Sequence, residues 1–112
     1  MKIAVDFDGT IVENQYPKIG PEIPGALNTL RELEDLGHQI ILCQVRKGRY
    51  LDQAVEYCRE NGVELWEQEE NFQRDTKWHI SNRAIGDLIV SDHQTDWNRI
   101  RQILRSRGVP LI

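Results

Sequence analysis

Short apolar runs alternate along this chain with segments whose apolar residues recur at helical spacing. Four runs have the length and composition of buried strands. They lie at residues 3–5, 38–44, 63–67 and 86–92. Three segments repeat apolar residues every three or four positions, which predicts helices. They lie at residues 24–37, 50–60 and 96–107. Strands that are apolar on both faces imply parallel pairing with helices on both sides, so we expect an α/β protein with a three-layer, Rossmann-like parallel sheet.

The connecting segments differ in character. Residues 11–23 hold several Pro and Gly residues, which predicts a loop or flap rather than a helix. Residues 68–82 are polar and predict a long loop with room for one helical turn, and long loops in compact domains are often functional. Residues 109–112 predict a fifth strand at the sheet edge, where Pro110 would be tolerated.

The composition is that of a single soluble domain over residues 1–112. Hydrophobic residues make up 39% and charged residues 29% of the chain, and the net charge is −4. That charge argues against nucleic acid and against a membrane surface as partners. No apolar run approaches the roughly 20 residues that a membrane span needs. Cys43 and Cys58 are not in a metal-binding or redox spacing, which favours a reduced, cytoplasmic setting.

Polar side chains follow three of the predicted strands. Asp6 and Asp8 come after the first run, Gln44 and Arg46 after the second, and Asp92 after the fourth. Ligands of open parallel sheets bind beyond the carboxyl ends of the strands, so these side chains are expected at one edge. Crowded carboxylates are costly there unless they are paired, and hard oxygen ligands suit Mg²⁺. The sequence therefore predicts a magnesium site.

Some of these residues have a plainer interpretation. A single Asp after a strand is usually a turn residue or a helix cap, and for Asp92 the two interpretations weigh about equally. Asp6 and Asp8 differ, because positions i and i+2 of an extended chain face the same side and hold two like charges close together. Gly9 then permits a tight turn, and the Thr10 hydroxyl can hold an aspartate side chain.

The stretch DFDGT at residues 6–10, directly behind an apolar strand, resembles the first motif of the haloacid dehalogenase (HAD) superfamily. The whole chain is similar to the small, capless, phosphatase-like members of that superfamily. Its other segments fall in the family's order. They lie at residues 13–20, 37–48, 51–62 and 87–92. The resemblance implies a HAD core with strand order 5-4-1-2-3, a short flap and no cap domain.

The resemblance also implies roles for the acidic residues. Asp6 would be the nucleophile that attacks phosphorus and forms an aspartyl-phosphate. Asp8 would be the general acid for the leaving group and then the base that activates water. Mg²⁺ would be bound by the Asp6 carboxylate, the Asp8 backbone carbonyl and the Asp92 carboxylate.

Two positions depart from the family's pattern. Gln44 stands where the second motif has Thr or Ser, and Arg83 stands where the third motif has Lys. Lys77, slightly upstream, is an alternative to Arg83, and either residue could instead be a solvated surface charge. Thr10, Arg46 and Lys77 are the expected contacts of the substrate phosphate. Arg46 would either orient the phosphate or pair with an acid.

Two functions follow from this pattern. The first is a Mg²⁺-dependent phosphatase that hydrolyses a small-molecule phosphate ester. A homo-oligomer is compatible with this function, because capless sites are often completed by a partner subunit. The second is a catalytically weak or inactive HAD-like domain that binds phosphate or metal or serves as an interaction module, and Gln44 favours it. A phosphoacceptor receiver domain needs a further Asp after the third strand, where the chain has only Glu67.

Overall fold

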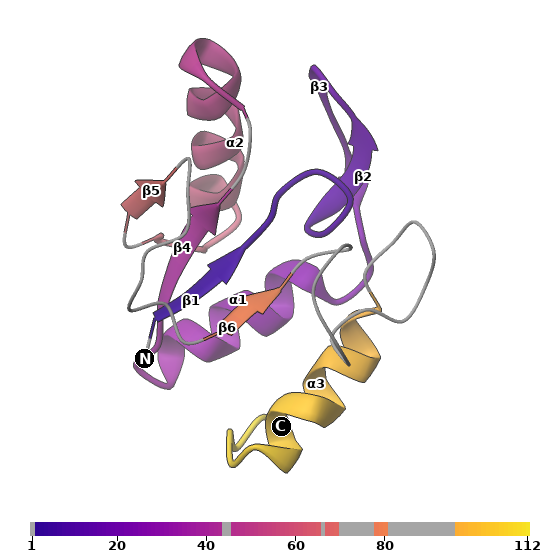
Figure 1. The fold of residues 1–112 in the computed structure, drawn as a ribbon, viewed down its shortest axis with the longest axis vertical. Helices are drawn as coiled ribbons and strands as arrows, with labels where there is room; N and C mark the ends of the chain where they lie inside the picture. The colour runs from indigo at the N-terminus through magenta and orange to yellow at the C-terminus, as the bar shows by residue number, and fades with distance from the viewer. Residues whose placement is uncertain (1, 44–45, 66, 70–77, 81–95) are drawn as a thin grey trace.

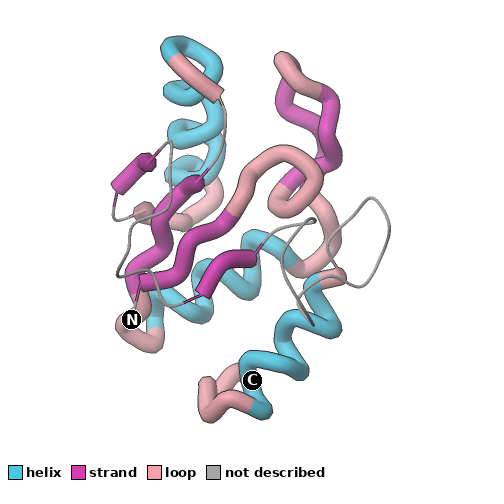
Figure 2. The backbone as a smooth tube through the Cα atoms, viewed as in Figure 1, coloured by secondary structure: helices cyan, strands magenta, loops and turns pink. Residues whose placement is uncertain are grey.

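The computed structural model describes residues 2–43, 46–65, 67–69, 78–80 and 96–112. Within these ranges the chain forms six strands and three helices, in the order β1–β2–β3–α1–β4–α2–β5–β6–α3 (Figures 1 and 2). No helix in these ranges has the length and apolar character to cross a membrane.

A four-stranded parallel sheet organises the fold. Its strands are β5 (Glu67–Glu69), β4 (Gln39–Cys43), β1 (Lys2–Val5) and β6 (Trp78–Ile80), in this spatial order. The strand β1 therefore lies inside the sheet, between β4 and β6 (Figure 1). The fold is α/β with a short parallel sheet, as the alternating pattern predicts.

Both faces of the central strands are buried. Ile3 and Val5 point to the face that shares a core with the helices, and their side chains are fully buried. Ala4 and its cross-strand partner Ile41 point to the opposite face and are buried as well. This double burial explains why the strand sequences are apolar without alternation.

The three predicted helices are present as α1 (Ala26–Asp35), α2 (Gly48–Glu60) and α3 (Trp97–Ser106). Each buries an apolar stripe in the common core. The buried apolar residues are Ala26, Leu27, Leu30 and Leu33 in α1, Ala54, Val55 and Cys58 in α2, and Trp97, Ile100, Ile103 and Leu104 in α3.

Two details at the ends of α1 differ from the prediction. The helix begins at Ala26 rather than at Pro24, because Gly25 has a φ of +87°, in the left-handed region that a right-handed helix cannot contain. Leu36, expected in the apolar stripe, lies just past the last helical residue and is 41% exposed.

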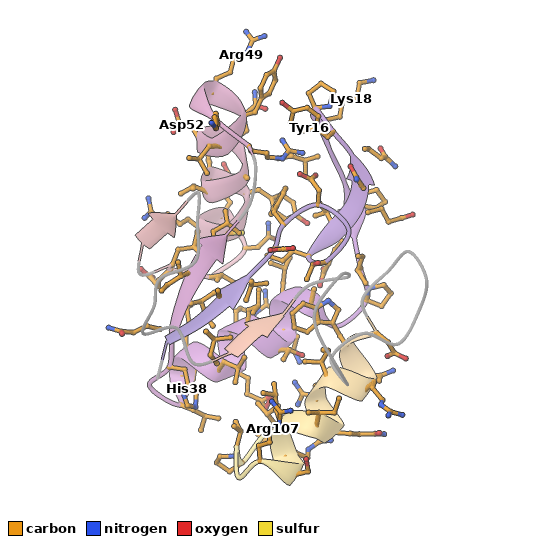
Figure 3. The ribbon with its side chains drawn as sticks, viewed as in Figure 1. Tyr16, Lys18, His38, Arg49, Asp52 and Arg107 are labelled. Carbon is orange, nitrogen blue, oxygen red and sulfur yellow. The ribbon has the colours of Figure 1, made fainter. Side chains whose placement is uncertain are left out.

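The segment predicted as a flap is a β-hairpin. Its strands are β2 (Val12–Gln15) and β3 (Lys18–Glu22), which pair antiparallel. Gly20 is required because a Cβ atom at this position would clash with the carbonyl oxygen of Glu13 on the facing strand. Figure 3 shows that Tyr16, at the hairpin tip, lies at the same end of the molecule as the first turn of α2.

The segment from residue 63 to residue 82 departs from the prediction. The strand expected at residues 63–67 begins only at Glu67, because Leu65 has a φ of +61° and interrupts the extended chain. The long loop expected at residues 68–82 instead includes the end of β5 and all of β6. The place beside β1 is taken by β6, and the strand predicted at residues 86–92 lies outside the described residues.

The expected edge strand at residues 109–112 is also wrong. The N–H of Leu111 donates to the carbonyl of Val109 at 2.9 Å, which closes a tight turn around Pro110. The N–H of Ile112 donates to the carboxylate of Glu32 on α1 at 2.7 Å. These donors are used by a turn and a side chain instead of by a neighbouring strand.

Candidate active site

Asp6 and Asp8 emerge at the carboxyl end of β1. Phe7, between them, is fully buried, whereas both aspartates are partly exposed. The alternation that buries Phe7 thus places the two carboxylates on the opposite side of the chain from the core. Gly9 follows with a φ of +82°, which bends the backbone away from the strand direction.

The turn after Asp6 is held by backbone hydrogen bonds. The carbonyl of Phe7 accepts the N–H groups of Thr10 (3.2 Å), Ile11 (2.9 Å) and Val12 (3.2 Å). The N–H of Gly9 donates to the carbonyl of Val12 at 2.7 Å, which joins the turn to the start of β2. The carbonyl of Asp8, which the HAD resemblance implies as a Mg²⁺ ligand, is not among the acceptors of these turn hydrogen bonds.

Arg46 makes polar contacts with two chain segments at this end of the sheet. Its side chain is fully buried, and it forms a two-pronged ion pair with Asp8, from Nε to Oδ2 at 2.8 Å and from Nη2 to Oδ1 at 2.7 Å. It also donates to the carbonyls of Pro17 at 3.0 Å and Lys18 at 2.8 Å, both at the hairpin tip. Arg46 therefore binds the Asp8 carboxylate and the flap at the same time.

Aromatic rings complete the surroundings of Arg46. Its guanidinium carbon lies 5.2 Å from the centre of the Phe7 ring and 5.1 Å from that of the Tyr16 ring. Both distances allow a favourable cation–π interaction. Tyr16 is 51% exposed and contacts Tyr50, in the first turn of α2, edge to face at 5.7 Å between ring centres. The flap tip is thus in contact with both Arg46 and α2.

The helix α3 contacts the same turn from its first residue. The indole Nε1 of the buried Trp97 donates to the carbonyl of Thr10 at 2.7 Å. The N–H of a buried Trp usually has a hydrogen-bond acceptor. A Trp in the apolar stripe of a predicted helix could therefore have been expected to lie next to a backbone carbonyl. Its role at the site is not apparent from helical spacing, which assigns Trp97 only to the apolar stripe.

The structure brings together four of the residues predicted for the site. These are Asp6, Asp8, Thr10 and Arg46. Of the two roles that the sequence leaves for Arg46, pairing with an acid is the one seen here. The remaining predicted site residues lie outside the described residues. They are Gln44, Lys77, Arg83 and Asp92.

The described residues supply part of the expected magnesium site. They contain no group of three or more His, Cys, Asp or Glu side chains placed to hold a metal. The third expected carboxylate, that of Asp92, is not among them. What they do offer is the Asp6 carboxylate and the Asp8 carbonyl on one turn, and both are oxygen donors of the type that Mg²⁺ prefers.

Cys58 is a free, buried cysteine among the described residues. Burial raises the pKa of its thiol to about 12, and the nearby Glu34 carboxylate adds to this effect. A thiol with such a pKa is protonated at neutral pH and is a poor nucleophile. The partly exposed Asp6 is therefore the better candidate for attack on a substrate.

Comparison with solved structures shows that this chain is similar to a protein of known structure. It is a protein from Bacteroides thetaiotaomicron, described as a conserved protein, which superposes with a TM-score of 0.80. The two sequences are 39% identical, and the match covers 97% of this chain and 93% of the other. This chain belongs to the same family as that protein. The description of the Bacteroides family member names no activity or ligand. No protein-family model matches the chain, and no curated protein does.

Proposed function

We propose that this protein is a Mg²⁺-dependent phosphatase of the HAD superfamily that hydrolyses a small-molecule phosphate ester. The observation that carries the proposal is the placement of Asp6 and Asp8 on either side of a buried Phe7, at the carboxyl end of an inner parallel strand. Ligands of such sheets bind at this edge. The three-layer core with strand order 5-4-1-2-3, the absence of a cap domain and a cytoplasmic location belong to the same proposal.

The reaction would use both aspartates. A carboxylate oxygen of Asp6 attacks phosphorus, an Asp–O–P bond forms, and the bond from phosphorus to the ester oxygen breaks. Asp8 gives its proton to the departing oxygen, which leaves as an alcohol. Asp8 then takes a proton from water, the resulting hydroxide attacks phosphorus, and the Asp6–phosphorus bond breaks to release phosphate.

The remaining residues position these groups. Asp6, the Asp8 carbonyl and Asp92 are the donors that would hold Mg²⁺. The bound ion would offset the repulsion between the anionic nucleophile and the anionic substrate. The hairpin of residues 12–22 is the cover that the described chain provides for the site, since it reaches Arg46 and α2 at its tip.

A screen of phosphorylated metabolites together with an aryl phosphate, with Mg²⁺ and with a chelator, tests this function. Mg²⁺-dependent phosphate release is expected, with complete loss in Asp6→Asn. Asp52→Asn is the matched control, because Asp52 is an exposed carboxylate on α2, away from the end of β1 (Figure 3). Equal turnover in the parent and in Asp6→Asn would contradict the mechanism.

A second function, a binding module, has specific support. Gln44 replaces the short hydroxyl of the second motif, and both Asp8 oxygens already accept hydrogen bonds from Arg46. Beryllium fluoride, a phosphoryl mimic, would still bind to Asp6 with Mg²⁺ in such a protein. Binding of the mimic without turnover of any ester would favour this second function.

A further inference from the structure

Arg46 binds two parts of the site at once, the Asp8 carboxylate and the tip of the hairpin. We propose that Arg46 is a positioning residue that couples closure of the hairpin to the orientation of Asp8, so that Asp8 is aligned only while the hairpin is closed. The consequence for turnover rests on the proposed phosphatase function. The coupling itself does not, because it is a property of the fold.

The hydrogen bonds of the guanidinium carry this inference. It has five N–H groups in one rigid plane, and they donate hydrogen bonds to Asp8, Pro17 and Lys18 among the described residues. Nε and Nη2 donate to Asp8, Nη1 donates to Pro17, and Nη2 donates also to Lys18. Nη2 donates both to the Asp8 carboxylate and to the hairpin. When the hairpin tip moves away, Arg46 therefore either loses its hydrogen bonds to the hairpin or follows the tip and loses those to Asp8.

Burial makes such a loss costly. The Arg46 side chain is fully buried and that of Asp8 is only 13% exposed, so neither can readily replace a lost partner with water. Unpaired buried donors carry a large desolvation cost, and this cost is greater for charged groups. The Tyr16 ring, which contacts the guanidinium at 5.1 Å, would leave together with the hairpin tip. Closed hairpin, paired Arg46 and oriented Asp8 therefore form one cooperative unit.

Amide hydrogen exchange of residues 12–22 tests the coupling without any substrate. Asp8→Asn leaves the hairpin residues unchanged, yet it weakens the partner that holds Arg46 in place. We expect it to raise hairpin exchange by about tenfold, and Arg46→Lys to raise it by at least as much, since an ammonium cannot serve four acceptors in one plane. Arg46→Met is expected to have the largest effect.

Arg59→Met is the matched control, because Arg59 is an exposed arginine on α2 whose guanidinium donates to the carbonyl of Glu64. Amide exchange of the hairpin in Arg59→Met should equal that in the parent. Parental hairpin exchange in folded Asp8→Asn, or in folded Arg46→Lys, would overturn the coupling. The conservative variants Asp8→Asn and Arg46→Lys keep the test decisive where Arg46→Met does not fold.

A kinetic cycle then separates positioning from a general structural role. If Arg46 acts through Asp8, Arg46→Lys should lower kcat in the parent by about tenfold or more and change it little in the Asp8→Asn background. Equal loss in both backgrounds would show that Arg46 does not act through Asp8 and would overturn the positioning role. If the parent turns over no phosphate ester, the proposed function fails, and the exchange measurement still decides the coupling.

Discussion

The indole Nε1 of Trp97 donates a 2.7 Å hydrogen bond to the carbonyl oxygen of Thr10, across a separation of 87 positions in the sequence. The bond joins the first residue of α3 to the turn that follows Asp8. Both residues are buried, so water is not at hand to replace the bond. The shape of the turn at the end of β1 therefore depends on a helix from the far end of the chain.

Replacing Trp97 by Phe should loosen this turn. The Thr10 carbonyl would be left without its donor, and we expect a loss of at least about 1 kcal/mol in the free energy of unfolding. Urea unfolding followed by circular dichroism measures the loss, and amide exchange of Thr10 to Val12 should rise. Ile100→Val, on the same helix, removes buried volume without a hydrogen bond and should leave that exchange unchanged. Unchanged turn exchange in Trp97→Phe would contradict the role assigned to the bond.

Mg²⁺ should stabilise the folded protein. A ligand that binds only the folded state raises stability by about 2.7 kcal/mol when its concentration is 100 times its dissociation constant, so the melting temperature should rise with added Mg²⁺. Asp92→Asn should remove most of the increase and Asp52→Asn should keep it. A melting temperature of the parent that does not respond to Mg²⁺ would count against the metal site.

Gln44→Thr should speed turnover. A short hydroxyl can donate to a phosphate oxygen from this position, whereas the longer amide has to bend away, and removing a preorganised donor typically costs roughly 10²–10³ in rate. We therefore expect kcat for simple esters to rise by about tenfold or more. Arg83→Lys should raise kcat further. The gain of the double variant should differ from the sum of the two single gains, since both groups would contact the same phosphate. A fall in kcat for Gln44→Thr would instead mark Gln44 as an adapted substrate contact.

Acid should weaken the contact between α1 and residues 101–112. The pKa of Glu32 lies below its usual value of 4.5, and the hydrogen bond from the N–H of Ile112 is the largest cause. Burial raises the pKa in part, whereas Arg101, 2.7 Å from the Glu32 carboxylate, lowers it further. Because the unfolded chain then binds more protons, the stabilisation is complete above about pH 4.5 and is lost as the pH falls through the folded pKa.

The matching experiment compares urea unfolding of the parent and of Glu32→Gln at about pH 6 and about pH 3.5. The loss of stability between the two conditions should be smaller in Glu32→Gln. Glu60→Gln, an exposed carboxylate at the end of α2, is the control and should behave as the parent does. An equal loss in the parent and in Glu32→Gln would contradict the assignment.

The positions of α1, α2 and α3 follow from the sequence alone, to within a few residues, because helix formation depends on neighbours three and four positions away. The same holds for the strands β1 and β4, whose apolar runs are long enough to require burial. The carboxylates of Asp6 and Asp8 could be placed at a strand end for the same local reason.

Tertiary contacts decided the rest. The strands β5 and β6 have only three residues each, too few to show a pattern, and their places follow from pairing with β4 and β1. Nothing local to Arg46 indicates that it binds Asp8, 38 positions away, together with the hairpin tip. Such pairs form because a buried charge needs partners wherever the fold brings them, and a linear sequence does not contain that geometry.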